Sequence, residues 1–209
     1  MKKWLFLALT AVLLLTLTCA GAENAMPETG DVVEGFILLE SRTFPLIDAQ
    51  VYLFEHEQTA AKLMYIANDD INRAFDLTFA TVPEDNTGLP HVFEHATLQG
   101  SEKYPSKTLF FNLSFQSYNT FMNAMTFSHM TTFPVASLSE AQLLKLADFY
   151  TDSCFHPSIM TDESIYREEA WRYRLMGAEE PLTIEGTVYS EMLGSYTLSR
   201  VAALNASRD

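Results

Sequence analysis

The residues best suited to chemistry are His91, Glu94 and His95, which together form the pattern H-x-x-E-H. Side chains four positions apart on an α-helix lie one turn above each other on the same face. Both imidazoles can therefore reach one ion, and neutral histidine nitrogen is a ready ligand for zinc. Glu94 projects close to the same face, where it can accept a proton from a water molecule that the metal activates. The spacing predicts a zinc site with a glutamate as general base.

Two histidines do not complete a catalytic zinc site, which normally has three protein ligands and one open position. The alternative interpretation of the motif is an exposed amphipathic helix with two solvated histidines. Many downstream residues offer a third ligand atom, and spacing alone does not choose among them. The candidates are Glu168, Glu169, Glu185, Glu191, His129 and His156.

Turn and capping residues predict the helix that must carry the motif. The stretch 83–90 is rich in turn formers, and Pro90 suits a first helical turn because its missing N–H costs nothing there. We expect the helix to run from Pro90 to about Gln99 and to stop at Gly100. A second helix is expected from Ser106 to Gln116.

Short or alternating apolar stretches predict the strands of a sheet, and an S-x-x-E capping box at Ser137 and Glu140 predicts another helix after them. A further helix is expected from Ser164 to Leu175. Because strands come first and helices later, the predicted fold class is α+β, a largely antiparallel sheet packed against a layer of helices. The predicted strands are Phe36–Leu39, Gln50–Phe54, Leu63–Ile66, a stretch with Phe75, Leu77 and Phe79, Asn119–Phe127 and Thr131–Ala136.

Charge and the amino-terminal residues bound the function further. The chain of 209 residues has a formal net charge of −14, which argues against nucleic-acid binding because phosphate backbones would be repelled. Residues 1–22 have the pattern of a secretory signal peptide: a basic start, the apolar run Trp4–Leu17, and small residues at Ala20–Ala22. The run is shorter than the about 20 apolar residues of a membrane helix. We therefore expect a secreted or periplasmic protein without a stable membrane span after cleavage.

The residues around the zinc motif resemble a known family. H-x-x-E-H is the inverted zinc motif of the pitrilysin and insulinase metallopeptidases. The stretch Thr87–Pro105 is similar to the G-x-x-H-x-x-E-H…L-x-G-S-x-K-Y-P signature of the presequence protease branch of that family. The similarity runs in unbroken order from His56 to Tyr196. Its later blocks are Asn119–Thr126, Phe133–Ser137, Glu169–Trp171, in which Ala170 replaces a glycine, and Gly186–Gly194.

The resemblance implies roles for individual residues. Glu191 would join His91 and His95 as the third ligand of Zn²⁺, and Glu94 would activate water. His129 departs from the family pattern, which often has an acidic residue there.

The resemblance also implies a place for the substrate. The segment Asn119–Thr126 would correspond to a sheet edge that receives a peptide as an added strand, with Asn123 and Ala124 as the substrate-binding residues. Because such pairing uses backbone hydrogen bonds, it tolerates many peptide sequences.

Finally, the resemblance implies a larger enzyme, because relatives have four similar domains in two halves that close around the peptide. We expect residues 23–209 to be the N-terminal catalytic zinc-metallopeptidase domain, truncated at its C-terminal end, with peptide substrates and a missing C-terminal half as partners. The expected activity is endopeptidase hydrolysis of unstructured oligopeptides. The alternatives are a non-catalytic peptide-binding or assembly subunit of the same fold, and a zinc-binding half that is inactive without a C-terminal half.

Overall fold

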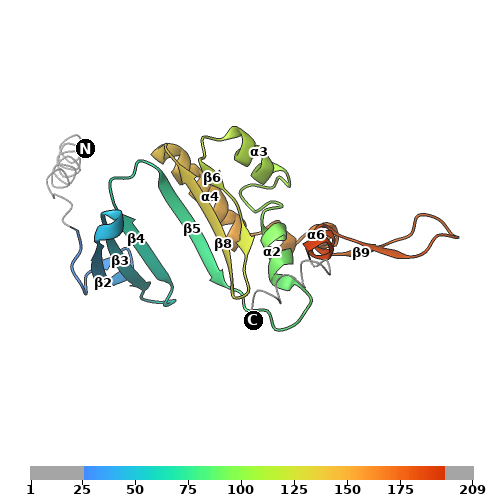
Figure 1. The fold of residues 1–209 in the computed structure, drawn as a ribbon, viewed down its shortest axis with the longest axis horizontal. Helices are drawn as coiled ribbons and strands as arrows, with labels where there is room; N and C mark the ends of the chain where they lie inside the picture. Colours follow the sequence, from blue (N-terminus) through green and yellow to red (C-terminus); the bar gives the residue numbers. More distant parts are fainter. Residues whose placement is uncertain (1–25, 196–209) are drawn as a thin grey trace, which may run out of the picture. The chain divides into compact units, whose positions relative to one another are not determined.

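The computed structural model describes residues 26–195 (Figure 1). The chain divides into two compact units between Asp69 and Asp70, and each unit is described by itself. The predicted signal peptide at residues 1–22 lies outside the described residues. Among the helices of residues 26–195, none has the length and apolar character needed to cross a membrane. The catalytic domain at residues 23–209 stays a prediction.

The first unit is an antiparallel sheet with the strand order β1-β2-β3-β4. Its small core is formed by Leu38, Tyr52 and Phe54, which alternate with more exposed residues along their strands. The three strands predicted for this region are present, and each is longer than predicted. The bounds are β1 Val32–Val33, β2 Phe36–Phe44, β3 Ala49–His56 and β4 Lys62–Ala67, with a short 3-10 helix, η1, at Pro45–Ile47.

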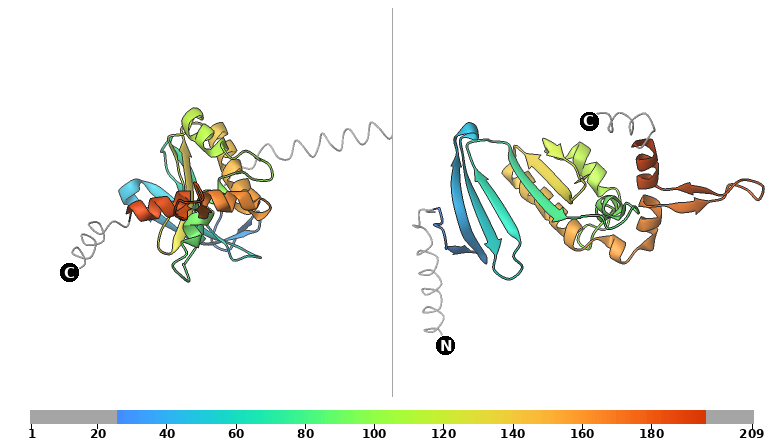
Figure 2. Two further views of the ribbon diagram at one scale, coloured as in Figure 1. Left: turned by 90° about the vertical axis from the view of Figure 1, so that its right-hand side faces the viewer. Right: turned by 60° about the horizontal axis from the view of Figure 1, so that its bottom comes forward.

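The second unit contains another antiparallel sheet, in which the central strand β8 (Met130–Ser137) pairs with β5 (Arg73–Ala80) on one side. On its other side β8 pairs with two short strands, β6 (Phe121–Met122) and β7 (Met125–Thr126). Helix α4 (Glu140–Phe155) packs against β5 and β8 (Figures 1 and 2). The core between them buries Phe133, Val135, Leu146, Phe149 and Tyr150.

The predicted strand Asn119–Phe127 is interrupted at Asn123 and Ala124, which lie between β6 and β7. The reason is Pro134, the residue of β8 that faces the gap. The Asn123 N–H donates to the Pro134 carbonyl at 3.2 Å, but proline has no N–H to donate in return. The Asn123 carbonyl instead accepts a 2.7 Å hydrogen bond from the buried Tyr150 hydroxyl. The core therefore replaces the missing ladder bond.

The remaining elements of the second unit include α2, which carries the sequence motif, and helices that contact it. The capping prediction at Ser137 is wrong: Ser137 is buried in β8, and Ser139 caps α4 by accepting from the Gln142 N–H. The predicted helix Ser164–Leu175 ends at Glu169, and the chain then enters a β-hairpin. The further bounds are α2 Leu89–Thr97, α3 Leu109–Gln116, η2 Ser158–Met160, α5 Glu163–Glu169, β9 Arg172–Arg174, β10 Thr183–Glu185 and α6 Thr187–Ser195. The α+β fold class is confirmed.

Candidate metal centre

Helix α2 carries the H-x-x-E-H motif, as its start and stop residues predicted. Gly88 precedes the helix with a φ of 72°, a left-handed conformation that glycine adopts without strain, and Pro90 lies in the first turn. Val92, on the buried face of α2, packs against Ala170 after α5 and Val188 in α6. This contact brings the end of α5 and the start of α6 against α2, which carries the motif.

The start of α6 is held close to the end of α5 by a glycine. A Cβ atom added at Gly186 would lie 2.0 Å from the carbonyl oxygen of Ala170, so the two backbones can approach this closely only if residue 186 has no side chain. The approach places α6 beside α2. Glu191, on the second turn of α6, consequently faces the two histidines of α2.

His91, His95 and Glu191 each offer one ligand atom, and these atoms all lie within 4.8 Å of one another. Glu191 Oε2 is 3.5 Å from His91 Nε2 and 3.4 Å from His95 Nε2. In a tetrahedral zinc site with metal–ligand bonds of about 2.0–2.1 Å, neighbouring ligand atoms are about 3.3–3.4 Å apart. The donor types and the two separations from Glu191 fit zinc.

A second carboxylate contacts His95 at Nδ1, the ring nitrogen that does not face Glu191. Glu169, which is only 6% exposed, lies with Oε2 3.1 Å from His95 Nδ1, and its Oε1 accepts a 2.8 Å hydrogen bond from Gln99. A proton on Nδ1 that is donated to Glu169 leaves the Nε2 lone pair directed at the candidate metal position. Sequence reasoning offered Glu169 only as an alternative ligand and missed this role, and it missed Gln99 entirely.

The same carboxylates affect the protonation of His95. The hydrogen bond to Glu169 raises the pKa of His95 above its ordinary value, and the charges of Glu191, Glu169 and Glu94 act in the same direction, while burial opposes them. Because a protonated imidazole cannot bind a metal, protons compete with zinc at this histidine as the pH falls.

Glu94 lies beside the three donor atoms in a pocket of about 560 Å³ and is 7% exposed. The predicted substrate-binding residues Asn123 and Ala124 line the same pocket. The structure therefore brings all six predicted site residues to one place, although the role of each stays a prediction. The rest of the lining is largely apolar and includes Leu98, Phe110, Phe111, Met125 and Phe127.

The other candidate ligands have different partners. Glu168 pairs with Lys107 at 2.9 Å, and Glu185 pairs with Arg172 at 3.2 Å. His156 contacts Asp152 at 3.2 Å within α4 and its C-terminal cap. His129 lies at the turn between β7 and β8, where its ring contacts Ser128. Among the described residues, none of these four joins the group of His91, His95 and Glu191.

A second pocket, of about 580 Å³, lies on another side of α2 and shares Glu94 with the first. Its wall includes Cys154, and burial raises the pKa of this thiol to about 12. At pH 8 we expect iodoacetamide to alkylate Cys154 on the order of 10³-fold more slowly than an unperturbed cysteine, because the thiolate is the reactive form. Peptide mapping by mass spectrometry measures this rate. Unfolding the protein in urea should restore the ordinary rate, and equal rates in both states would contradict the buried thiol.

The sequence matches a known protein family. A family model described as insulinase, peptidase family M16, matches residues 81–202, which is more than half of the chain. The chain belongs to this family. The matched residues include all six predicted site residues, and the expected insulinase and pitrilysin type is confirmed.

Individual relatives show how much of the family protein the chain represents. It is 40% identical over 167 residues to protein HypA of Clostridium perfringens, covering 80% of this chain and 17% of HypA. It is 38% identical over 149 residues to presequence protease 1, chloroplastic/mitochondrial, of Arabidopsis thaliana, covering 71% and 14% of the two chains. The crystal structure of pitrilysin shares the fold, with a TM-score of 0.52, 21% identity and coverage of 66% of this chain and 14% of that chain. The chain therefore spans about a sixth of the length of these proteins.

The predicted secreted or periplasmic location is wrong. The matched presequence proteases are named mitochondrial, as in Emericella nidulans and Gibberella zeae, or chloroplastic/mitochondrial, as in Arabidopsis thaliana, and not secreted or periplasmic. The prediction depended on the basic start, the apolar run Trp4–Leu17 and the small residues Ala20–Ala22. An apolar run by itself does not identify the compartment to which a protein is delivered. This run also lies outside both the family match and the described residues.

Proposed function

We propose that the chain supplies the zinc-binding and catalytic part of a metalloendopeptidase that hydrolyses unstructured oligopeptides. The observation that carries the proposal is the grouping of His91, His95 and Glu191, with Glu191 at zinc-like separations from both histidines. The buried carboxylate of Glu94 lies beside them. The family membership supports a peptidase in particular.

The residues of the pocket divide the chemistry among them. A zinc ion held by the three donors would supply a Lewis acid that polarises a peptide carbonyl and lowers the pKa of water to about 7. Glu94, which is not one of the three donors, takes the proton of the attacking water and passes it to the amine that leaves. Glu169 keeps His95 in the tautomer that leaves Nε2 free for the metal.

The interrupted edge of the sheet supplies a site for the peptide backbone. Both backbone groups of Asn123 are already engaged, its N–H by Pro134 and its carbonyl by Tyr150. In an antiparallel pair the next residue directs its N–H and carbonyl the opposite way, so those of Ala124 point away from β8. Ala124 is therefore the better candidate for pairing with an added strand, and Asn123 can contact a substrate through its side chain.

The apolar lining of the pocket suggests which peptides are cleaved. Leu98, Phe110 and Phe111 line the space next to the donor atoms. An apolar substrate side chain buried there gains about 1.5–3 kcal/mol from leaving water. We propose that the scissile bond has a large apolar residue beside it.

Metal removal tests the proposal. We expect a quenched fluorescent peptide with a central phenylalanine to be cleaved by the zinc-loaded protein, not after chelation, and again after zinc is restored. Because the chain spans about a sixth of its relatives, the assay is run both alone and with the remaining part of C. perfringens HypA added. Cleavage that survives full chelation would exclude a zinc mechanism.

The short span of the chain favours a second candidate, a zinc-binding half that cannot turn over alone. In that case, cleavage appears only when the HypA remainder is added. Peptide binding without cleavage in either setting would instead identify a non-catalytic binding subunit.

A further inference from the structure

The hairpin of β9 and β10 forms a two-stranded ribbon that extends away from the helices α5 and α6 (Figures 1 and 2). Its register pairs Arg172 with Glu185, Tyr173 with Ile184, and Arg174 with Thr183. Directly paired residues lie on the same face of a ribbon, and successive residues alternate between faces. The two faces of the ribbon therefore have different compositions.

One face is polar and contains two arginines that share one carboxylate. Arg172 and Arg174 both form ion pairs with Glu185, and Thr183 completes this face. Because the two guanidinium groups share this one carboxylate, the face keeps a net charge of +1 and is the more hydrophilic of the two.

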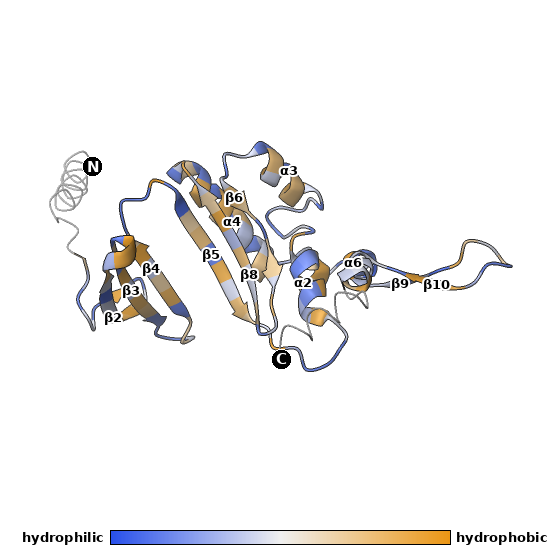
Figure 3. Ribbon diagram, in the orientation of Figure 1, coloured by the Kyte–Doolittle hydropathy of each residue, from blue (hydrophilic) through white to orange (hydrophobic). Residues whose placement is uncertain are grey.

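The other face, here called the apolar ribbon face, consists of large apolar side chains. The ring centroids of Trp171 and Tyr173 are 5.4 Å apart in an edge-to-face contact. Apolar positions recur along the hairpin (Figure 3). The members and their exposed fractions are Trp171 44%, Tyr173 64%, Leu175 60%, Leu182 61% and Ile184 43%.

An isolated two-stranded ribbon is at best marginally stable in water, and it normally needs a third strand or a packing surface on its apolar side. A contiguous set of large exposed apolar side chains also marks a site of protein or membrane contact. The apolar ribbon face therefore needs a cover that the described residues of the chain do not provide.

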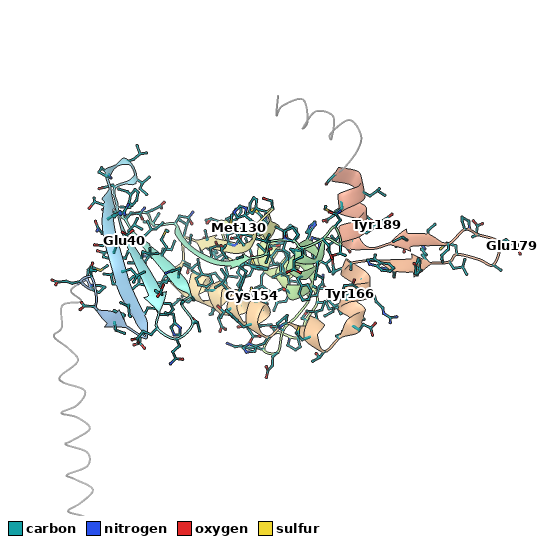
Figure 4. The ribbon with its side chains drawn as sticks, turned by 90° about the horizontal axis from the view of Figure 1, so that it is seen from below. Glu40, Met130, Cys154, Tyr166, Glu179 and Tyr189 are labelled. Carbon is teal, nitrogen blue, oxygen red and sulfur yellow. The ribbon has the colours of Figure 1, made fainter. Side chains whose placement is uncertain are left out.

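The charges at the tip of the ribbon argue against a lipid surface as that cover. Glu179 lies at the end of the ribbon, followed by Glu180 (Figure 4). Two carboxylates at the tip would be repelled by an anionic membrane, and interfacial segments are instead rich in lysine and arginine. A protein surface is the better match.

The coverage of the relatives indicates which polypeptide could cover the apolar ribbon face. The ribbon lies within the residues that match the family model, 81–202, yet the chain spans only 14–17% of the relatives HypA and presequence protease 1. Most of each relative consequently lies outside the aligned region. We propose that the apolar ribbon face is the surface on which that remaining polypeptide docks. The inference rests on the proposal that further chain completes the enzyme.

The position of the ribbon gives the docking a consequence for the metal. β10 leads through Gly186 directly into α6, whose Glu191 is the predicted third ligand. A partner that holds the ribbon also restrains the start of α6. Docking should therefore lower the mobility of the carboxylate at the metal as well as add surface around the substrate.

Binding in trans tests the proposal with the purified zinc-loaded protein and, as probe, C. perfringens HypA lacking the region aligned with this chain. Tyr173→Thr combined with Ile184→Thr removes two central side chains of the apolar ribbon face and places threonine, a β-branched residue that favours strands, at both positions. We expect this variant to bind the probe at least tenfold more weakly than the wild type in surface plasmon resonance. Thr183→Gln, on the polar face of the same strand, is the matched control and should bind as the wild type does.

Each outcome decides the matter. Loss of binding in the apolar-face variant alone, with unchanged circular dichroism and zinc content, supports the docking surface. Equal binding by wild type and variant overturns it, as does no binding of the probe. A concentration-dependent dimer in sedimentation that the apolar-face variant abolishes would assign the face to a second copy and reject the proposed partner. Binding to the probe without any peptidase activity would reject the proposed function and leave the docking surface standing.

Discussion

Glu94→Gln is expected to lower peptide hydrolysis by about 10²–10⁴-fold while leaving zinc bound. Glutamine has the shape of glutamate but cannot take a proton from water, so the change removes the base and keeps the packing. Glu94 is 7% exposed and lies beside the three donor atoms without being one of them, which is why the metal should remain. The measurement is kcat/KM for the phenylalanine peptide together with zinc content by atomic absorption, under whichever conditions the wild type is active.

The matched control is Glu84→Gln. Glu84 is exposed and lines the second pocket, so the variant has the same loss of charge without a change at the donor atoms. It should cleave at close to the wild-type rate. A Glu94→Gln protein that cleaves at the wild-type rate would show that another group acts as base, and one that loses zinc would show that Glu94 helps to hold the metal.

The helix that carries the motif could be predicted because its signals are local. Gly88 and Pro90 mark the start, Gly100 follows the end, and the i, i+4 spacing places His91 and His95 on one face whatever the rest of the chain does. Most strands of the two four-stranded sheets were likewise predicted from apolar patterns, although β1 was not predicted and the predicted strand Asn119–Phe127 is interrupted.

Contacts between distant parts of the chain were harder to predict. Four glutamates were equally placed as third ligand by spacing, and the contact of Val92 with Ala170 and Val188 is what turns α6 toward α2. The family resemblance, not the residue pattern, singled out Glu191. The role of Glu169 likewise depends on a 74-residue separation from His95 that no local signal reports.

The interruption of the edge strand at Asn123 shows the same limit in the sheet. Apolar residues predict a continuous strand, and nothing near Asn123 marks a break. The break comes from Pro134 on the neighbouring strand and is made stable by the Tyr150 hydroxyl. The effect of Pro134 on Asn123 could be predicted only if the register between β8 and its neighbouring strands were already known.

His91→Ala is expected to weaken zinc binding by on the order of 10²–10³-fold, because one ligand of a complete zinc site contributes about 2.5–4 kcal/mol of a total near 10–16 kcal/mol. His91 Nε2 lies 3.5 Å from Glu191 Oε2, so its removal opens one corner of the donor group and leaves the other two in place. Competition with a chromogenic chelator measures the affinity, and hydrolysis should fall with zinc occupancy. His129→Ala is the control and should leave the affinity unchanged, since His129 contacts Ser128 instead.

Glu169→Gln distinguishes a ligand from a residue that orients one. It should weaken zinc binding at pH 8 by only about 10–100-fold, the usual effect of an outer-shell partner. The hydrogen bond to Glu169 is the main cause that raises the pKa of His95 in the metal-free protein. The wild type should therefore bind zinc more weakly as the pH falls through that raised pKa. In the variant the pKa of His95 drops, and the loss of affinity should begin at a lower pH. Identical pH profiles of zinc affinity for the two proteins would contradict the orienting role of Glu169. An unchanged zinc affinity in the His91→Ala variant would contradict the assignment of the metal site.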